Sequence, residues 1–228
     1  MISAWNGVIR CDDHYALCVL VFLGKRDERK GRLMKGVDLA VDRKWPVDLA
    51  RFSGLVVLAW RLGLGHWVPM WSPLVGQIMI LGHITRRGGR YHRTPVHYAL
   101  VDGEIYCLST FGDRCGWHHN VNTNPEVEVW LPDGWWAGIA EEVTDSRLRT
   151  PLLRQVLLHS GLFARAVGLE PHAMTNEELA AATRHLRLIK ILRTRPCTGP
   201  GGPGDLGWIW QITTGILLLT LLSRRKRY

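Results

Sequence analysis

The sequence predicts a mainly β fold of the α+β class: a small barrel of antiparallel strands with covering helices, plus a C-terminal hydrophobic helix. Three observations predict it. Short β-like runs separated by turn residues fill residues 77–143, two of the turns have hairpin chemistry, and one β run returns near residue 186 after a helical stretch. A late strand of this kind can close an antiparallel sheet into a barrel. With 228 residues, the chain is long enough for one such domain and its appendages.

The N-terminal part is expected to lie outside this domain. Residues 1–45 form an unassigned extension, because a short apolar run and the charged run KRDERKGR show no sustained period. One hypothesis places the natural start at Met34. Residues 47–64 are predicted as a helix that is apolar nearly all round and is followed by tryptophans. Such a helix either packs on the barrel or lies at a membrane interface.

Six strands are expected in the domain, which we place at residues 46–195. Asp102-Gly103 joins two of them, because this dipeptide tolerates the positive φ angles of a tight hairpin. A second hairpin turns at Pro132-Asp133-Gly134. The predicted strands are residues 77–84, 94–101, 104–110, 127–131, 135–143 and 186–192.

Helices are expected between and after the hairpins. The segment WHHNVNTNPE reads as one short helix that Pro125 stops. Asp145 is a candidate N-cap for helical spacing over residues 147–163, and Thr175 with Glu178 forms a capping box for a further helix.

The C-terminal tail has two parts. Residues 196–205 (PCTGPGGPGD) read as a flexible Gly/Pro linker. The tail proper, residues 206–228, begins with 17 residues without a charge, which is the lower limit for a transmembrane helix, and then carries RRKR. It is expected to span the bilayer or to lie in its interface, with a buried helix as the alternative. The basic end of the tail is expected to stay on the cytoplasmic side. We expect a membrane-associated protein whose catalytic domain is also on the cytoplasmic side. If the tail spans the bilayer, this needs a second crossing, for example within residues 52–81, and export of the whole barrel is the alternative.

Charge and cysteine content narrow the class of protein. The formal net charge is +9, and the five cysteines have irregular spacing, which favours a reducing compartment over a disulfide framework. Nucleic-acid binding is not expected, because it would need a broad basic stripe. The basic residues instead gather in two clusters, one suited to a cofactor phosphate and the other to lipid headgroups: Arg86, Arg87, Arg90 and Arg93, and Arg224, Arg225, Lys226 and Arg227.

The segment TRRGGRYHRTP, residues 85–95, carries the clearest binding chemistry. Gly88 and Gly89 lie between arginines on the connection from one strand to the next. Glycine lets backbone amides approach an anion, and guanidinium groups match phosphate oxygens. The segment is therefore predicted to bind a phosphate, with a solvated turn as the alternative.

Two further segments complement it. One strand ends in Ser109-Thr110-Phe111-Gly112, and the short helix opens with Trp117-His118-His119-Asn120. Together they can offer an aromatic wall, backbone amides and an asparagine to a planar heterocycle.

These motifs resemble those of the deazaflavin-dependent nitroreductases, split β-barrel oxidoreductases whose core reads roughly GRxSGxxRxTP, then an Asp-Gly hairpin, then WxxNLxxNPxVEV. Here the matching text is RRGGRYHRTPVHYALVDGEIYCLS and WHHNVNTNPEVEVWLPDGWW, so the resemblance covers residues 77–143 well and 145–194 in general layout. It implies an FMN-binding split barrel. The implied reaction is hydride transfer from a reduced 8-hydroxy-5-deazaflavin coenzyme of the F-420 type to a quinone-like or nitro acceptor.

Carried over position by position, the resemblance also implies a set of site residues. Those facing the cofactor's phosphate are Arg87, Arg93, Thr94 and Pro95, with Gly88 and Gly89 in the loop. Those lining the deazaflavin are Ser109, Phe111, Gly112, Trp117 and Asn120. The chain departs from the family pattern at Thr85, Gly88 and His118, where the family has glycine, serine and tyrosine.

Alternatives stay open at this level. FMN, FAD or haem could replace the deazaflavin, and the protein could be a non-catalytic, membrane-attached flavin or haem carrier. His118 and His119 are candidates for protonating the acceptor, although histidines at such a position are more often structural. With Cys115 they fill only part of a zinc shell, so no metal is expected. A small-molecule electron acceptor and membrane lipid are the expected partners, and related split barrels imply a possible homodimer.

Overall fold

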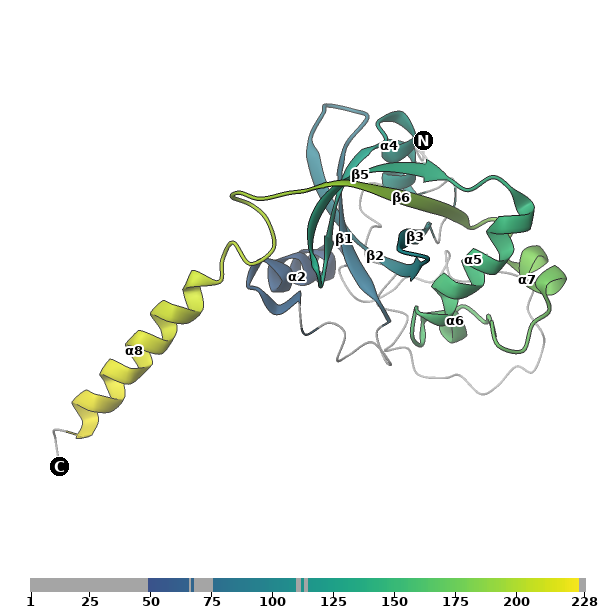
Figure 1. The fold of residues 1–228 in the computed structure, drawn as a ribbon. Coiled ribbons are helices and arrows are strands. Elements are labelled where there is room, and N and C mark those ends of the chain that lie inside the picture. The colour runs from purple at the N-terminus through teal and green to yellow at the C-terminus, as the bar shows by residue number, and fades with distance from the viewer. Residues whose placement is uncertain (1–48, 66, 68–75, 110–111, 113–114, 226–228) are drawn as a thin grey trace, which may run out of the picture.

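The computed structural model describes residues 49–65, 67, 76–109, 112 and 115–225. At its centre is a closed barrel of antiparallel strands in the order β1-β2-β3-β6-β5-β4 (Figure 1). The strands are β1 (Ile78–Ile84), β2 (Tyr91–Val101), β3 (Glu104–Ser109), β4 (Glu126–Leu131), β5 (Gly134–Glu142) and β6 (Arg187–Pro196). The late strand β6 closes the barrel by pairing with both β3 and β5. The predicted α+β barrel is confirmed.

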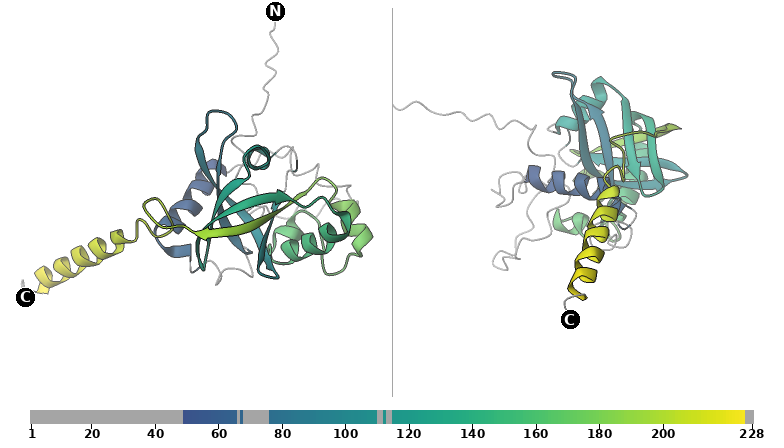
Figure 2. Two further views of the ribbon diagram at one scale, coloured as in Figure 1. Left: turned by 45° about the horizontal axis from the view of Figure 1, so that its top comes forward. Right: turned by 90° about the vertical axis from the view of Figure 1, so that its left-hand side faces the viewer.

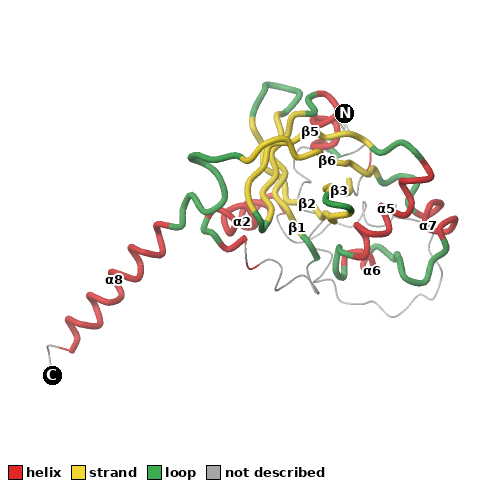
Figure 3. Tube along the Cα trace, viewed as in Figure 1, coloured by secondary structure: helices red, strands yellow, loops and turns green. Residues whose placement is uncertain are grey.

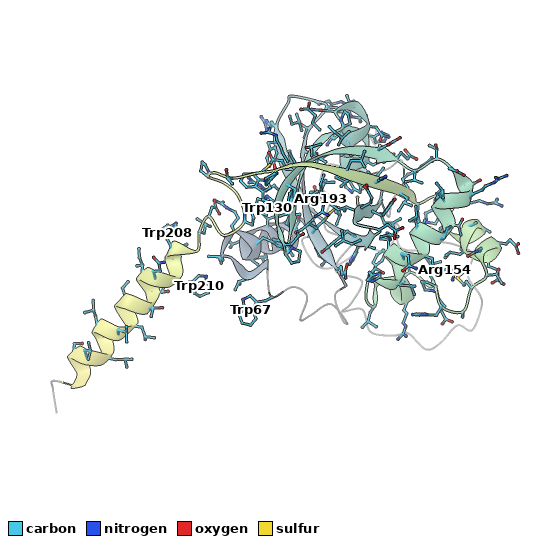
Figure 4. All side chains as sticks on the ribbon, in the orientation of Figure 1. Trp67, Trp130, Arg154, Arg193, Trp208 and Trp210 are labelled. Carbon is cyan, nitrogen blue, oxygen red and sulfur yellow. The ribbon has the colours of Figure 1, made fainter. Side chains whose placement is uncertain are left out.

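Both predicted hairpins turn where the sequence indicated. Asp102 and Gly103 have φ angles of 53° and 81°, and Gly134 has a φ of 151°, values that suit glycine and, more rarely, aspartate. The tips of the two hairpins are joined by Arg193 of β6 (labelled in Figure 4). Its guanidinium donates to the Gly103 carbonyl at 3.0 Å and lies 3.3 Å from the Asp133 carboxylate.

Two strands are longer than predicted. β2 begins at Tyr91, which pairs with Ile84, so part of the arginine-rich motif is strand and only residues 85–90 form the connection. β6 runs on to Pro196, whereas the predicted strand ended at residue 192 and the predicted linker began at residue 196. An irregularity between Ala137 and Gly138 of β5 shifts the register and lets Pro196, the last strand residue, lie opposite Trp136.

All described helices except α8 lie against the barrel or against one another, and they are shown in red in Figure 3. The described helices are α2 (Leu49–Arg61), α4 (Gly116–Thr123), α5 (Ser146–Leu158), α6 (Phe163–Ala166), α7 (Asn176–Ala182) and α8 (Trp208–Arg225). The caps agree with the sequence: the Asp145 side chain accepts from the Arg147 amide, and Thr175 and Glu178 bond reciprocally. The single helix predicted over residues 147–163 ends at Leu158, before Gly161 with its φ of 62°.

Three clusters of apolar side chains hold these layers together. Leu81, Val129 and Ile189 are fully buried inside the barrel. A second cluster fills the space between the barrel and helices α5 to α7. In the third, Trp60 of α2 packs on Ile80 and Trp130. The helix predicted at residues 47–64 therefore packs on the barrel, as one of its two interpretations held.

The segment between β6 and α8, predicted as a flexible linker, is bound to the barrel in the structure. Arg93 donates to the Gly201 carbonyl at 2.6 Å, and the Gly204 amide donates to the Trp60 carbonyl at 3.0 Å. The Arg61 guanidinium lies 2.6 Å from the Asp205 carboxylate and holds the pKa of that carboxyl below its usual range. These contacts connect the start of α8 to α2 and β2.

Helix α8 extends away from the barrel in all views (Figures 1 and 2). Its apolar side chains are exposed, for example Leu219 at 69% and Ile216 at 57%. Near its start, Trp210 donates its indole N–H to the Leu62 carbonyl at 2.8 Å. Among the described helices, none combines the length and hydropathy needed to cross a bilayer, so the predicted transmembrane helix is not confirmed. Polar residues such as Gln211 and the two terminal arginines lower the mean hydropathy of α8.

The buried position of Ile189 gives a test of barrel closure. Truncating Ile189→Ala is expected to lower the free energy of unfolding by about 2–5 kcal/mol, because it leaves a cavity in the barrel interior. Urea unfolding followed by tryptophan fluorescence measures this change. The variant Arg195→Ala, which changes an exposed residue of the same strand, serves as control and should change stability by less than about 0.5 kcal/mol. Equal effects of the two variants would contradict the closure by β6.

Candidate functional site

The loop at residues 85–90 joins β1 to β2 and is closed by its own residues. The Thr85 hydroxyl donates to the Arg87 carbonyl at 3.0 Å and accepts from the Arg90 amide at 3.0 Å. Gly88 and Gly89 have φ angles of 85° and 60°, a region that favours glycine. A Cβ at either position would meet no atom within 4 Å, so the conformation rather than crowding requires glycine here. The loop therefore presents a closed turn to solvent.

The loop is joined to α4, although the two are far apart in sequence. The Arg86 amide donates to the Asn120 side-chain oxygen at 3.1 Å, across 34 positions of the chain. Asn120 is 4% exposed and faces β1 from α4. This contact brings together the two segments that carried the family resemblance.

Behind this contact lies a buried chain of hydrogen bonds. The Asn120 amide nitrogen lies 3.4 Å from His83 Nδ1, and His83 Nε2 lies 3.1 Å from the Thr94 hydroxyl. His83 is 1% exposed and Thr94 is 2% exposed. Since the Asn120 oxygen accepts from Arg86, its nitrogen donates, and His83 Nδ1 must accept. His83 is then protonated at Nε2 and donates to Thr94.

The neutral form of His83 is favoured by its surroundings. Burial lowers its pKa to about 4, and the neighbouring His92 adds to the shift. The two imidazole rings are stacked with their centroids 6.3 Å apart. A neutral ring fits the hydrogen bonds described above, because a protonated ring could not accept from Asn120.

The arginine-rich motif is divided between two surfaces. Arg87, Gly88 and Gly89 are exposed in the loop, and Thr94 points into the barrel interior with His83. Arg93 does not lie with them. Its guanidinium lies over the rings of Tyr91 and Trp130, at 5.0 and 4.8 Å from their centroids, and donates to Gly201.

The expectation that Arg93 faces the phosphate together with Thr94 therefore needs correction. Neighbouring residues of a strand point to opposite faces, so Arg93 and Thr94 cannot share one. Counted back from Thr94, the arginine of the pattern GRxSGxxRxTP falls on His92, and the first arginine falls on Arg86. Pro95 is buried and, because it is next to Thr94 in the strand, lies on the same outer face as Arg93.

The residues expected to line the ring lie at the end of β3 and in α4. Ser109 is fully buried and donates to the Gly112 carbonyl at 3.2 Å. Gly112 has a φ of 52°, and a Cβ there would come within 2.0 Å of the His185 carbonyl oxygen. Trp117 is 1% exposed and belongs to the interior cluster. Phe111 lies outside the described residues. Contact of these residues with a ring stays a prediction.

The two histidines proposed as proton donors differ in their surroundings. His118 is 2% exposed, with Nε2 at 3.1 Å from Glu142 and 3.2 Å from the Asn122 amide nitrogen. Arg187 lies 3.4 Å from the other oxygen of Glu142. His118 thus ties α4 to β5, while His119 is half-buried. Within the described part of the chain, no three His, Cys, Asp or Glu residues gather as metal ligands, Cys115 included.

Sequence reasoning missed His83. It lies in the predicted strand QIMILGHI, two residues after Leu81, and strand alternation alone would have placed it on the interior face with Met79 and Leu81. That a buried histidine should have polar partners is also a general expectation. Its partners could not be named, because they come from another strand and from α4.

A closed antiparallel barrel, a glycine-arginine loop and an asparagine-bearing helix beside it are the features that the resemblance to the split-barrel oxidoreductases implied. The family model of the F420-H(2)-dependent quinone reductases matches residues 66–163, which include the loop, the end of β3 and α4. The resemblance to the deazaflavin-dependent reductases is thereby confirmed. This match, over less than half of the chain, supports a deazaflavin-dependent oxidoreductase.

Solved structures with a similar barrel include a conserved hypothetical protein from Mycobacterium tuberculosis (20% identity, 55% of this chain and 85% of that chain, TM-score 0.41). An F420-H2-dependent reductase is also similar (15% identity, 51% and 94%, TM-score 0.38). A FAD-binding protein from Mesorhizobium loti is a third (20% identity, 55% and 87%, TM-score 0.34). Similarities at this level carry no argument about function. None of the curated proteins matches the chain.

The buried His83 makes stability depend on pH. Its pKa is about 4 in the folded chain against an ordinary value of 6.5, so between these values the unfolded chain binds a proton that the folded chain does not. The free energy of unfolding should therefore fall as the pH falls from 6.5 to 4, by up to about 3 kcal/mol. Urea titrations across this window measure it. The His83→Gln variant lacks the titrating imidazole but keeps the carboxylates, so it shows how much of the pH dependence the carboxylates cause. Parallel pH profiles of the two proteins would contradict the assignment of the pH dependence to His83.

Proposed function

We propose that the protein transfers a hydride from a reduced 8-hydroxy-5-deazaflavin coenzyme to a quinone-like or nitro acceptor. The observation that carries the proposal is the Arg86–Asn120 hydrogen bond, which joins the phosphate-loop motif to the α4 motif at one end of the barrel. The family match over residues 66–163 supports the coenzyme class and the quinone class of acceptor. FMN, FAD and haem have no comparable support.

The loop at residues 85–90 fits the phosphate-bearing part of such a coenzyme. Gly88 and Gly89 have positive φ angles, and no atom lies within 4 Å of a Cβ placed at either of them. Arg86, Arg87 and Arg90 are exposed on the same short segment. Backbone amides in such a turn, together with arginines, form an anion-binding concavity. Arg93 has no place in this set, because it is bound to the linker.

The residues of the chain supply position rather than chemistry in this reaction. When bound, the coenzyme supplies the hydride, as cofactors generally carry the reactive step. Asn120 holds the Arg86 amide of the loop, and the packed interior around Trp117 excludes water from the barrel side. Since His118 is bound to Glu142, we assign the delivery of a proton to the acceptor to His119 or to water.

The phosphate assignment is tested by comparing two arginines. Arg87→Ala should weaken coenzyme binding by about 1.5–3 kcal/mol, the range for a hydrogen bond to a charged group, whereas Arg93→Ala should have a smaller effect. Titration of the coenzyme's fluorescence measures both dissociation constants. Arg165→Ala, which changes an exposed arginine of α6, controls for net charge. A larger loss of coenzyme affinity in Arg93→Ala than in Arg87→Ala would indicate that the phosphate binds at the outer face of β2.

The alternative of a non-catalytic carrier predicts a different outcome in a simple assay. Reduced deazaflavin is mixed with the full-length protein and a soluble quinone, and its oxidation is followed by absorbance. Turnover above the uncatalysed rate is expected. A bound chromophore that is not oxidised by the quinone would favour the carrier. Native mass spectrometry of the same sample tests the expected homodimer.

We also propose that the protein associates with a membrane surface through α8, with the barrel on the cytoplasmic side. Exposed apolar side chains surround this helix, and Trp208 and Trp210 lie at its start, 54% and 49% exposed (Figure 4). The sequence ends in RRKRY, whose four basic residues suit anionic headgroups. A helix with apolar length, interfacial tryptophans and a basic end can bind in the interface without crossing it.

Deleting residues 206–228 tests this attachment. The deletion leaves the Arg61–Asp205 ion pair intact and removes only α8 and the residues at its ends. The shortened protein should move from the membrane fraction to the supernatant on centrifugation, because the buried apolar area and the basic end are both lost. A protein that still sediments with membranes would place the attachment elsewhere, for example at the exposed Leu55 of α2 and at the exposed Trp67.

A further inference from the structure

We propose that His83 is a positioning residue of the coenzyme site, which fixes the Asn120 carboxamide and, through it, the backbone of the loop at residues 85–90. The identity of the ligand rests on the proposed function above. The ordering of the loop does not, since it depends on contacts within the chain. Three hydrogen bonds carry the inference: Thr94 to His83, His83 to Asn120, and Asn120 to the Arg86 amide.

The chain of bonds has a defined direction because each group has one usable role. The Asn120 oxygen is taken by the Arg86 amide, so its nitrogen must donate to His83. His83 then has one donor left, which the Thr94 hydroxyl receives. All three side chains are at most 4% exposed, so water does not easily replace a missing partner. A change at His83 is therefore felt at the far end, at Arg86.

The far end is the part of the loop that matters for an anion. Arg86 is the second loop residue, and Thr85 beside it closes the turn onto Arg90. If Asn120 turns away, the Arg86 amide loses its acceptor and the positive-φ residues Gly88 and Gly89 lose one of their fixed ends. Glycine has more backbone conformations available than any other residue, so these two positions gain the most freedom when the loop is released. His83 thus keeps a glycine-containing loop in one conformation before any ligand binds.

The experiment compares the full-length protein with His83→Leu and His83→Gln. Leucine removes both hydrogen bonds, while the glutamine amide can still accept from Asn120 and donate to Thr94. Amide hydrogen exchange of the protein without coenzyme is read at residues 85–90. His83→Leu should speed exchange there by about fivefold or more, as expected for the loss of one hydrogen bond. His83→Gln should stay close to the unchanged protein.

Two controls separate positioning from general stability. His97→Leu changes a histidine of β2 that is 2% exposed and packs near Phe163, 5.2 Å between ring centroids, so it should leave exchange at residues 85–90 unaltered. Asn120→Ala should itself loosen the loop, and adding His83→Leu to it should change nothing further, because the path through Asn120 is already broken.

Coenzyme titration gives the second reading. The dissociation constant of the deazaflavin should rise in His83→Leu about as much as loop exchange does, and be restored in His83→Gln. The proposal is overturned if His83→Leu leaves loop exchange unchanged, if both His83 variants are equally impaired, or if exchange rises over all barrel strands alike. Failure of every form to bind the coenzyme would instead reject the proposed function, and the exchange data would still decide the role of His83.

Discussion

Successive side chains of a strand point to opposite faces, and in β2 this constraint decides what each residue of the arginine-rich motif can do. The Thr94 side chain points into the barrel and is hydrogen-bonded to His83. The side chain of Arg93, one residue earlier, points outward and donates to the Gly201 carbonyl. The strand begins at Tyr91, so only residues 85–90 are free to form a turn. The candidate site follows from this division. The loop lies exposed outside the barrel, and the hydrogen bonds that hold the loop lie buried in the interior.

Features that depend on neighbouring residues could be predicted from the sequence. The turn at Asp102-Gly103 and the capping box of Thr175 and Glu178 are local, and both form as expected. Barrel closure was also predictable, because one β run returned after the helices. The ends of β2 and β6 were not, since a strand continues for as long as a neighbour supplies hydrogen bonds, and that depends on register and on the irregularity at Ala137 in β5.

The candidate site was predictable as a set of segments but not as a set of contacts. The loop glycines and Asn120 were found, because glycine beside arginine has a local meaning and the family resemblance covered both segments. The partner of Arg93 is 108 positions away, in a segment that seemed flexible from its glycines and prolines. The role of His83 was not predicted, because it depends on a hydrogen bond to Asn120, 37 positions later in the chain. Long-range partners of polar side chains are what a single sequence does not contain.

Because of the same alternation, the two faces of β2 make two separate sets of contacts. The outer face of β2 binds the linker through Arg93, near the Arg61–Asp205 ion pair at the base of α8, and the inner face holds the loop through Thr94 and His83. The two sets share a strand but no hydrogen bond among those described above. The contacts at the base of α8 are therefore separate from those that hold the loop, so the proposed attachment through the tail would not need to disturb the proposed binding of a coenzyme at the loop.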